Sequence, residues 1–319
     1  MSARAEVQPR LLVGLDNFGD FLPPDRWREL LDIAAAADAA GVDGIVLVDH
    51  VVLGGDLSAY PYGPFASGSD APWLEPLTTL AAIAGRTSRL RLATGILIAP
   101  LRPPALLAKM AATLDLLSSG RLDLGVGTGW HAKEYEAVGL DFAERGRLLD
   151  DALEACQALW RGGPTSFSSP RLRFDDVYSH PRPVQGGGVP FWIGGELHRR
   201  NLSRLVRFGR GWIPSPTARR EDVRAGIEKL DEALAEAGRD PAEVRVRIGL
   251  PTARDDRRRP RLGRSLARVP ELLELGATDV YVSFAQFCQD PAEAPEFFRA
   301  LASGFETAVR SGRAPSAAA

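Results

Sequence analysis

The sequence predicts an α/β fold in which eight parallel strands close into a (β/α)8 TIM barrel. Three observations support this prediction. Short apolar segments alternate with longer amphipathic ones along all 319 residues. The strands expected at 90–98 and 122–126 flank a helix at about 103–117, which is a parallel βαβ unit. No internal boundary interrupts the alternation, so we expect one domain over 1–319. An open doubly wound sheet is the alternative.

Each expected element follows from its residue pattern. Buried strands appear as short apolar runs at 11–15, 44–48, 90–98, 122–126, 191–193, 211–213, 244–250 and 279–284. Helices with an apolar stripe are expected from Pro24 to Gly41, and at 74–84, 103–117, 141–160, 198–208, 219–237, 262–275 and 291–309. Two segments break the alternation. The segment 51–73, which follows the second strand, is too long for a turn and is predicted to form a lid-like loop. The segment 162–189 is predicted to be an insertion that contains a short ribbon.

Composition limits the possible partners. The formal net charge of −2 provides no general attraction to nucleic acid or an anionic membrane. The arginine-rich run at 254–264 has no interleaved aromatic residues, which favours a solvated loop. Cys156 and Cys288 are the only cysteines, the histidines lack metal-binding spacing, and no apolar run reaches the ~18 residues of a membrane helix. We therefore expect a cytoplasmic protein without a metal, acting on a small molecule.

Candidate site residues follow several strands. Ligands bind at the carboxyl ends of parallel strands, and Asp49 and His50 end the second strand. Histidine exchanges protons near neutral pH, although a structural role for His50 is equally compatible with the sequence. Gly125, Gly127 and Gly129 indicate either the close approach of another group or a tight turn.

Two helix starts could also belong to the site. Glu134 opens the helix after the glycines, and a charge interaction with the helix N-terminus is favoured over a position facing the site. Gly194 and Gly195 precede a helix whose first turn could bind an anion, with Arg199 and Arg200 adding charge, or they form a plain βα turn. Trp130 occupies the sixth position of the glycine motif, which argues against a Rossmann dinucleotide site.

Several segments together resemble the bacterial luciferase-like monooxygenase superfamily, and within it the branch that uses the deazaflavin coenzyme F420. They are GIVLVDHVV at 44–52, the glycine-containing unit at 90–142, ERGRLLDDALEACQALW at 144–160, PRPVQGGGVPFWIGG at 181–195 and RFGRGWIPS at 207–215. The resemblance covers nearly the whole chain. It implies a barrel that binds a deazaflavin or flavin at the carboxyl ends of its strands, and it suggests a homodimer.

The resemblance also implies roles for particular residues. A cis peptide bond between Gly95 and Ile96 would form a bulge behind the cofactor ring, and His50 would be the acid/base group. The implied cofactor-binding residues are Asp49, His50, Thr94, Gly95, Ile96, Gly127, Thr128, Gly129, Trp130, Glu134, Gly194, Gly195 and Glu196. The expected substrate-binding residues are Asn17, Tyr60, Tyr62, Phe65 and Trp73.

Two positions depart from the family pattern. The sugar-phosphate dehydrogenases of this branch have a glutamate directly after the glycine turn, where this chain has Trp130. Arg210 replaces the usual aspartate in an FGDGW-like motif, which places a cation either near the cofactor's anionic tail or on the surface. The sequence therefore predicts an oxidoreductase that transfers a hydride between F420 and a small, partly apolar substrate. The alternative is a monooxygenase that uses oxygen and reduced FMN from a partner reductase.

Overall fold

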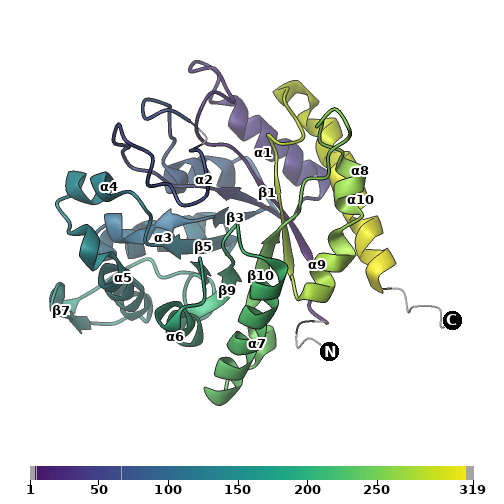
Figure 1. The fold of residues 1–319 in the computed structure, drawn as a ribbon. Coiled ribbons are helices and arrows are strands. Elements are labelled where there is room, and N and C mark those ends of the chain that lie inside the picture. Colours follow the sequence, from purple (N-terminus) through teal and green to yellow (C-terminus); the bar gives the residue numbers. More distant parts are fainter. Residues whose placement is uncertain (1–3, 5, 66, 314–319) are drawn as a thin grey trace.

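A closed parallel barrel forms the centre of the molecule (Figure 1). The computed structural model describes residue 4, residues 6–65 and residues 67–313. The barrel strands are β1 (Arg10–Gly14), β2 (Gly44–Leu47), β3 (Arg91–Thr94), β5 (Leu122–Gly127), β8 (Phe191–Gly194), β9 (Gly209–Ile213), β10 (Arg245–Gly249) and β11 (Asp279–Ser283). Parallel pairing of β1 with β11 closes the ring, with Arg10 opposite Asp279. The predicted barrel is confirmed, and the open sheet is excluded.

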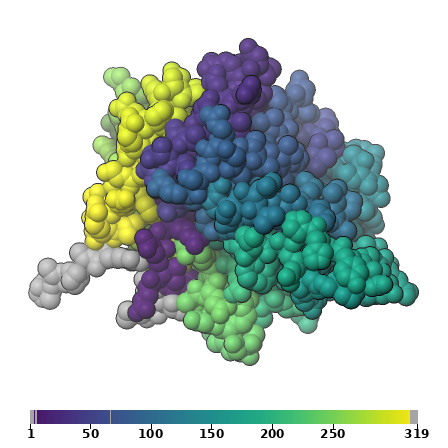
Figure 2. All heavy atoms as spheres, turned by 180° about the vertical axis from the view of Figure 1, so that it is seen from behind, coloured from purple at the N-terminus to yellow at the C-terminus, as the bar shows by residue number. Residues whose placement is uncertain are grey.

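Helices surround the barrel because most of them bury apolar residues against the outer faces of the strands. They are α1 (Glu29–Ala40), α2 (Pro76–Ala84), α3 (Pro104–Leu117), α4 (Ala132–Ala137), α5 (Arg145–Trp160), α6 (Arg199–Phe208), α7 (Arg220–Glu236), α8 (Leu262–Leu266), α9 (Val269–Leu275) and α10 (Ala294–Arg313). The C-terminal α10 packs against α1, which brings the two ends of the chain's core together (Figure 2).

Three helix predictions need correction. The first helix begins at Glu29 rather than near Pro24, because residues 24–28 form turns. The helix predicted at 262–275 is divided into α8 and α9, and Pro270 lies in the first turn of α9, where a missing N–H group is tolerated. A short 3₁₀ turn at Phe142–Glu144 precedes α5. None of the helices in the described part of the chain is long and apolar enough to cross a membrane.

The insertion lies between α5 and β8. Strands β6 (Thr165–Ser168) and β7 (Arg173–Val177) form an antiparallel ribbon in which Phe167 is paired with Phe174. The predicted ribbon is therefore confirmed. It projects beside α5 and α6 rather than joining the barrel (Figure 1).

The strand predicted at 90–98 is interrupted. Strand β3 ends at Thr94, and the chain resumes as β4 (Leu97–Ile98), which pairs with β5. The peptide bond between Gly95 and Ile96 is cis, as the family resemblance implied. The apolar pattern alone did not reveal the interruption, whereas the family resemblance implied a bulge at this position.

The alternating glycines of β5 make room for this bulge. A Cβ atom on Gly125 would lie 2.0 Å from the carbonyl oxygen of Thr94, and one on Gly127 would lie 2.9 Å from Cδ1 of Ile96. A Cβ atom on Gly129 would meet the Ile98 side chain at 3.0 Å. The group that approaches these glycines is thus the protein's own chain.

We expect the Gly127→Ala substitution to lower the free energy of unfolding by about 1–3 kcal/mol, because the added methyl group overpacks against Ile96. Chemical denaturation measures the change. Gly249→Ala is the matched control, since a Cβ atom there meets nothing within 4 Å. Equal effects of the two substitutions would show that the bulge does not press on β5.

Candidate active site

An aromatic pocket of about 190 Å³ opens at the carboxyl ends of β2, β4 and β5. Its lining comes from the strand ends, the bulge, the loop after β5 and the lid-like loop. The lining residues are Phe18, Val48, Asp49, His50, Tyr60, Phe65, Trp73, Gly95, Ile96, Ile98, Gly129 and Trp130. The structure therefore gathers most of the predicted ring-binding and substrate-binding residues around one cavity.

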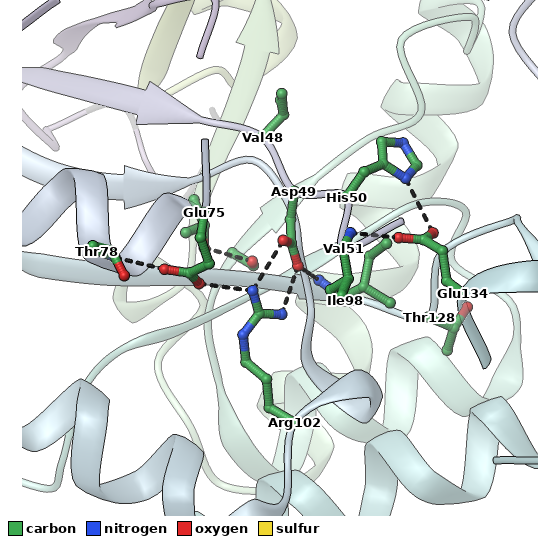
Figure 3. A network of polar contacts seen from close by, with 12 residues as sticks. Val48, Asp49, His50, Val51, Glu75, Thr78, Ile98, Arg102, Thr128 and Glu134 are labelled. Carbon is green, nitrogen blue, oxygen red and sulfur yellow. Dashed lines mark hydrogen bonds and ion pairs between the residues drawn. The ribbon is translucent and has the colours of Figure 1, made fainter. Parts of the chain in front are cut away.

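His50 is fixed in this pocket by a buried carboxylate. Its Nδ1 lies 3.0 Å from Oε2 of Glu134, whose side chain is fully buried, and the other carboxylate oxygen accepts the Val51 N–H at 2.8 Å (Figure 3). The ring packs edge-on against Trp73 and Trp130. The favoured interpretation of Glu134 as a helix-terminus charge partner is wrong, because its carboxylate is directed at His50 and Val51. This contact leaves Nε2 as the ring nitrogen free to exchange a proton with a ligand.

Asp49 points away from His50 and holds the bulge in place (Figure 3). Its buried carboxylate forms a bidentate ion pair with Arg102, at 2.7 and 3.0 Å, and accepts the Ile98 N–H at 2.8 Å. Arg102 also contacts Glu75 at 2.7 Å. Burial lowers the pKa of Arg102, but its bonds to Asp49 and Glu75 outweigh this and raise it. Asp49 therefore lies beside the pocket, while its charge is engaged by Arg102.

The lid-like loop at 51–72 is attached to the start of α4. The Gly54 N–H donates to Nε2 of His131 at 2.7 Å, and the Ser69 hydroxyl donates to the Gly54 carbonyl at 2.7 Å. Burial lowers the pKa of His131, with His50 and Lys133 acting in the same direction and Glu134 and Asp56 opposing them. A neutral His131 is needed, because a protonated Nε2 cannot accept the Gly54 N–H.

We expect this attachment to weaken in acid. The folded-state pKa of His131 lies below its unfolded value of about 6.5, so its contribution is complete above that pH and is lost as the pH falls through the folded pKa. Limited proteolysis of the loop at pH 7.5 and 5.0 tests this. His131→Gln should remove the pH dependence that His131 causes. An unchanged acid effect in this variant would assign it to a group other than His131.

Three predicted site residues do not line the pocket, and two of them have structural roles. Asn17 is fully buried, and its amide bonds to Val48 and to the Leu74 carbonyl, so the prediction that it binds substrate is wrong. Thr94 is also buried, and its hydroxyl donates to the Gly125 carbonyl. Tyr62 is 40% exposed and contacts Tyr60 rather than lining the pocket.

A second, basic cavity of about 300 Å³ adjoins the first. It is lined by Gly127, Thr128, Ala143, Arg145, Gly146, Leu149, Gly194, His198, Arg200, Asn201 and Arg204. The side chain of Ile96 lines the aromatic pocket and also packs on Gly127 and Gly194, where Cβ atoms would lie 2.9 and 2.6 Å from it. The two cavities thus share the bulge and the loop at 127–130 as their common wall.

The basic cavity suits an anion. Arg145, Arg200 and Arg204 supply positive charge, and α6 begins beside Gly194. Arg204 is buried and bound to Asp150, whereas Arg200 lies 3.7 Å from the same carboxylate and is half exposed. Helix N-termini and arginines together favour phosphate groups. Glu196 is exposed and Arg199 is absent from the lining, so their predicted contributions are not supported.

Arg210 is at the opposite end of the barrel. It lies at the amino end of β9, is exposed, and pairs with Glu243 at 2.9 Å. The surface interpretation of this departure from the family pattern is therefore correct. The run at 254–264 is also exposed apart from a few residues, and Asp255 accepts bonds from Arg257, Arg259 and Arg261.

Sequence reasoning missed several residues that form the site. Arg102 lies 53 positions from Asp49, and no local pattern connects them. Arg145 and Arg204 belong to amphipathic helices, where a charged residue normally indicates only a solvated face. Phe18 directly follows Asn17 at the end of the first predicted strand, and this position could have identified it.

Comparison with known proteins agrees with this geometry. The sequence model of the family described as luciferase-like monooxygenase matches residues 11–261. This chain belongs to that family. Its members include F420-dependent and FMN-dependent enzymes, and the similarity extends through the two cavities.

Three of the similar proteins illustrate both cofactors. An F420-dependent glucose-6-phosphate dehydrogenase of Nocardia farcinica is 35% identical over 217 residues, covering 66% of this chain and 58% of that protein. An F420-dependent secondary alcohol dehydrogenase bound to an F420–acetone adduct has a TM-score of 0.73 at 16% identity, covering 93% of this chain and 99% of its own. The FMN-bound oxygenating constituent of 3,6-diketocamphane monooxygenase from Pseudomonas putida has a TM-score of 0.69 at 16% identity, covering 94% and 98%. The two structural likenesses establish the fold.

Proposed function

We propose that this luciferase-like protein transfers a hydride between coenzyme F420 and a small, uncharged organic substrate that carries oxygen on the reacting carbon. The observation that carries the proposal is the pair His50 and Glu134, which places a proton-exchanging group in an aromatic pocket. Similarity to the 35% identical F420-dependent dehydrogenase is the reason for proposing this cofactor.

The residues present fit such a cofactor. A planar ring suits the aromatic pocket, whose floor is the Gly95–Ile96 bulge, and a phosphate suits the basic cavity with Arg145 and Arg200. Side chains at Gly127 and Gly194 would fill the space occupied by Ile96 at the boundary between the two cavities. The bound cofactor would supply or accept the hydride.

The protein's own groups would handle the proton and the surroundings. His50 would exchange a proton at Nε2 with the substrate oxygen, while Glu134 keeps Nδ1 engaged. Tyr60 and Phe65 of the lid-like loop would cover the substrate and exclude water.

The pocket also limits the substrate. No arginine or lysine lines it in the described structure, and the charge of Asp49 is paired with Arg102. A phosphorylated or carboxylated substrate would lose its hydration there without gaining a partner. We therefore propose an alcohol or ketone with an apolar body.

Separate titrations of the purified protein with F420 and FMN test the proposal. We expect saturable F420 binding, detected by a change in absorbance, and anaerobic turnover of small ketones with the reduced cofactor. Tight FMN binding without F420 binding, with oxygen consumed during substrate oxidation in the presence of a flavin reductase, would instead establish the monooxygenase.

A further inference from the structure

Arg247 is an unpaired charge inside the barrel. It lies in β10, where Val246 faces the surrounding helices and Arg247 faces inward. The side chain is 3% exposed, and none of its three guanidinium nitrogens has a hydrogen-bond partner in the described structure. The Cζ atom lies 4.4 Å from the centre of the Trp192 ring, which offers a cation–π contact.

Two neighbouring carboxylates are each bound to another arginine, although Oδ1 of Asp279 has no hydrogen-bond partner in the described structure. Arg10 and Tyr281 also act on Arg247. Asp123 binds Arg91 at 2.5 Å, and Asp279 binds Arg245 at 2.6 Å. Asp279 also accepts the Thr278 hydroxyl at 2.7 Å. Burial lowers the pKa of Arg247, which these carboxylates oppose, but a guanidinium group stays protonated in proteins. Arg247 thus keeps a positive charge without a carboxylate of its own.

The position of this charge relates it to the pocket. A Cβ atom on Gly95 would lie 3.8 Å from Nη1 of Arg247, and Gly95 forms part of the floor of the aromatic pocket. The guanidinium therefore lies close to the pocket floor, beside the Val46 side chain, which would meet the same Cβ atom at 2.5 Å. In such a poorly solvated region a fixed charge acts strongly on a neighbouring ligand.

We propose that Arg247 acts through the pocket floor on the bound cofactor ring and favours its ionised, negatively charged form. This inference rests on the proposed function, because it requires a deazaflavin or flavin ring above the bulge. Arg247 does not touch the ring in this arrangement. It sets the electrostatic potential in which the ring binds.

The test measures the pKa of the bound cofactor ring. Its absorbance is recorded as a function of pH in the complex with the intact protein. We expect this pKa to be lower in the wild-type complex than in free cofactor, and Arg247→Met to raise it by about one unit or more, as Coulomb's law gives for one charge within ~10 Å at an effective dielectric constant of ~20. Arg247→Lys should retain most of the wild-type shift.

Arg245→Met is the matched control. Arg245 is the preceding inward-facing residue of β10, one layer farther from the floor, and already bound to Asp279. We expect its removal to change the ring pKa less than removal of Arg247. Circular dichroism establishes that each variant is folded.

Each outcome decides a different point. A wild-type complex whose ring ionises at the same pH as free cofactor overturns the role of Arg247, even if Arg247→Met does not fold. An equal ring pKa in wild type and Arg247→Met also overturns it and leaves Arg247 with a structural role only. Failure of both F420 and FMN to bind would instead contradict the proposed function.

Discussion

Replacing Asp49 by alanine is expected to lower the free energy of unfolding by about 3–5 kcal/mol, because it leaves the buried Arg102 without its main partner. The Asp49 side chain is fully buried, and Arg102 is only 9% exposed. The loss also removes the acceptor of the Ile98 N–H, so the bulge should loosen as well. Urea denaturation measures the free energy of unfolding. Cofactor titration measures the affinity, which should fall if the bulge loosens.

Two further variants separate the charge from the packing. Asp49→Leu combined with Arg102→Met removes both charges, so it should recover part of the stability lost in Asp49→Ala. Arg219→Gln breaks an exposed pair with Asp222 and should leave the unfolding midpoint unchanged within error. If Asp49→Ala were as stable as Arg219→Gln, the buried pair would contribute nothing to the fold.

Replacing His50 by alanine is expected to reduce turnover by about 10²–10⁴-fold, the usual contribution of a positioned acid/base group. Cofactor affinity should change little, because the apolar pocket and the basic cavity remain. Steady-state kinetics and a cofactor titration of the same preparation measure the two effects separately.

Glu134→Gln tests how His50 is positioned. Glutamine keeps the size of the side chain and can still accept the Val51 N–H, but it removes the negative charge beside Nδ1. We expect a smaller loss of turnover than in His50→Ala, together with a displaced pH profile. A purely structural role for Glu134 would lower stability and leave the pH profile in place. Undiminished turnover in His50→Ala would contradict the assignment of the proton to this residue.

The barrel could be predicted from the sequence because its strands are buried on both sides and therefore appear as short apolar runs. The apolar pattern alone gave one strand from Leu90 to Ile98, and the bulge that interrupts it was expected only from the family resemblance. The start of the first helix was placed a few residues too early, and the break between α8 and α9 was not predicted.

The site could be predicted where the residues follow strands, as Asp49 and His50 do, because the fold brings all carboxyl ends to one face. The contacts between side chains that are distant in the sequence could not be predicted from the residue pattern. Nothing local indicates that Glu134 turns toward His50, or that Asp49 pairs with Arg102. The inward position of Arg247 could have been predicted from the segment RVRIG at 245–249. Side chains alternate between the two faces of a strand, so Arg245 and Arg247 share the inner face.

The lid-like loop lines the aromatic pocket, and none of its described residues lines the basic cavity. Under the proposed function, separate stretches of the chain would bind the substrate and the cofactor phosphate. Exchanging residues 56–65 for the corresponding stretch of a relative could therefore redirect selectivity while the anchoring arginines stay untouched. In this barrel, new specificities can arise by local replacement of a single surface segment.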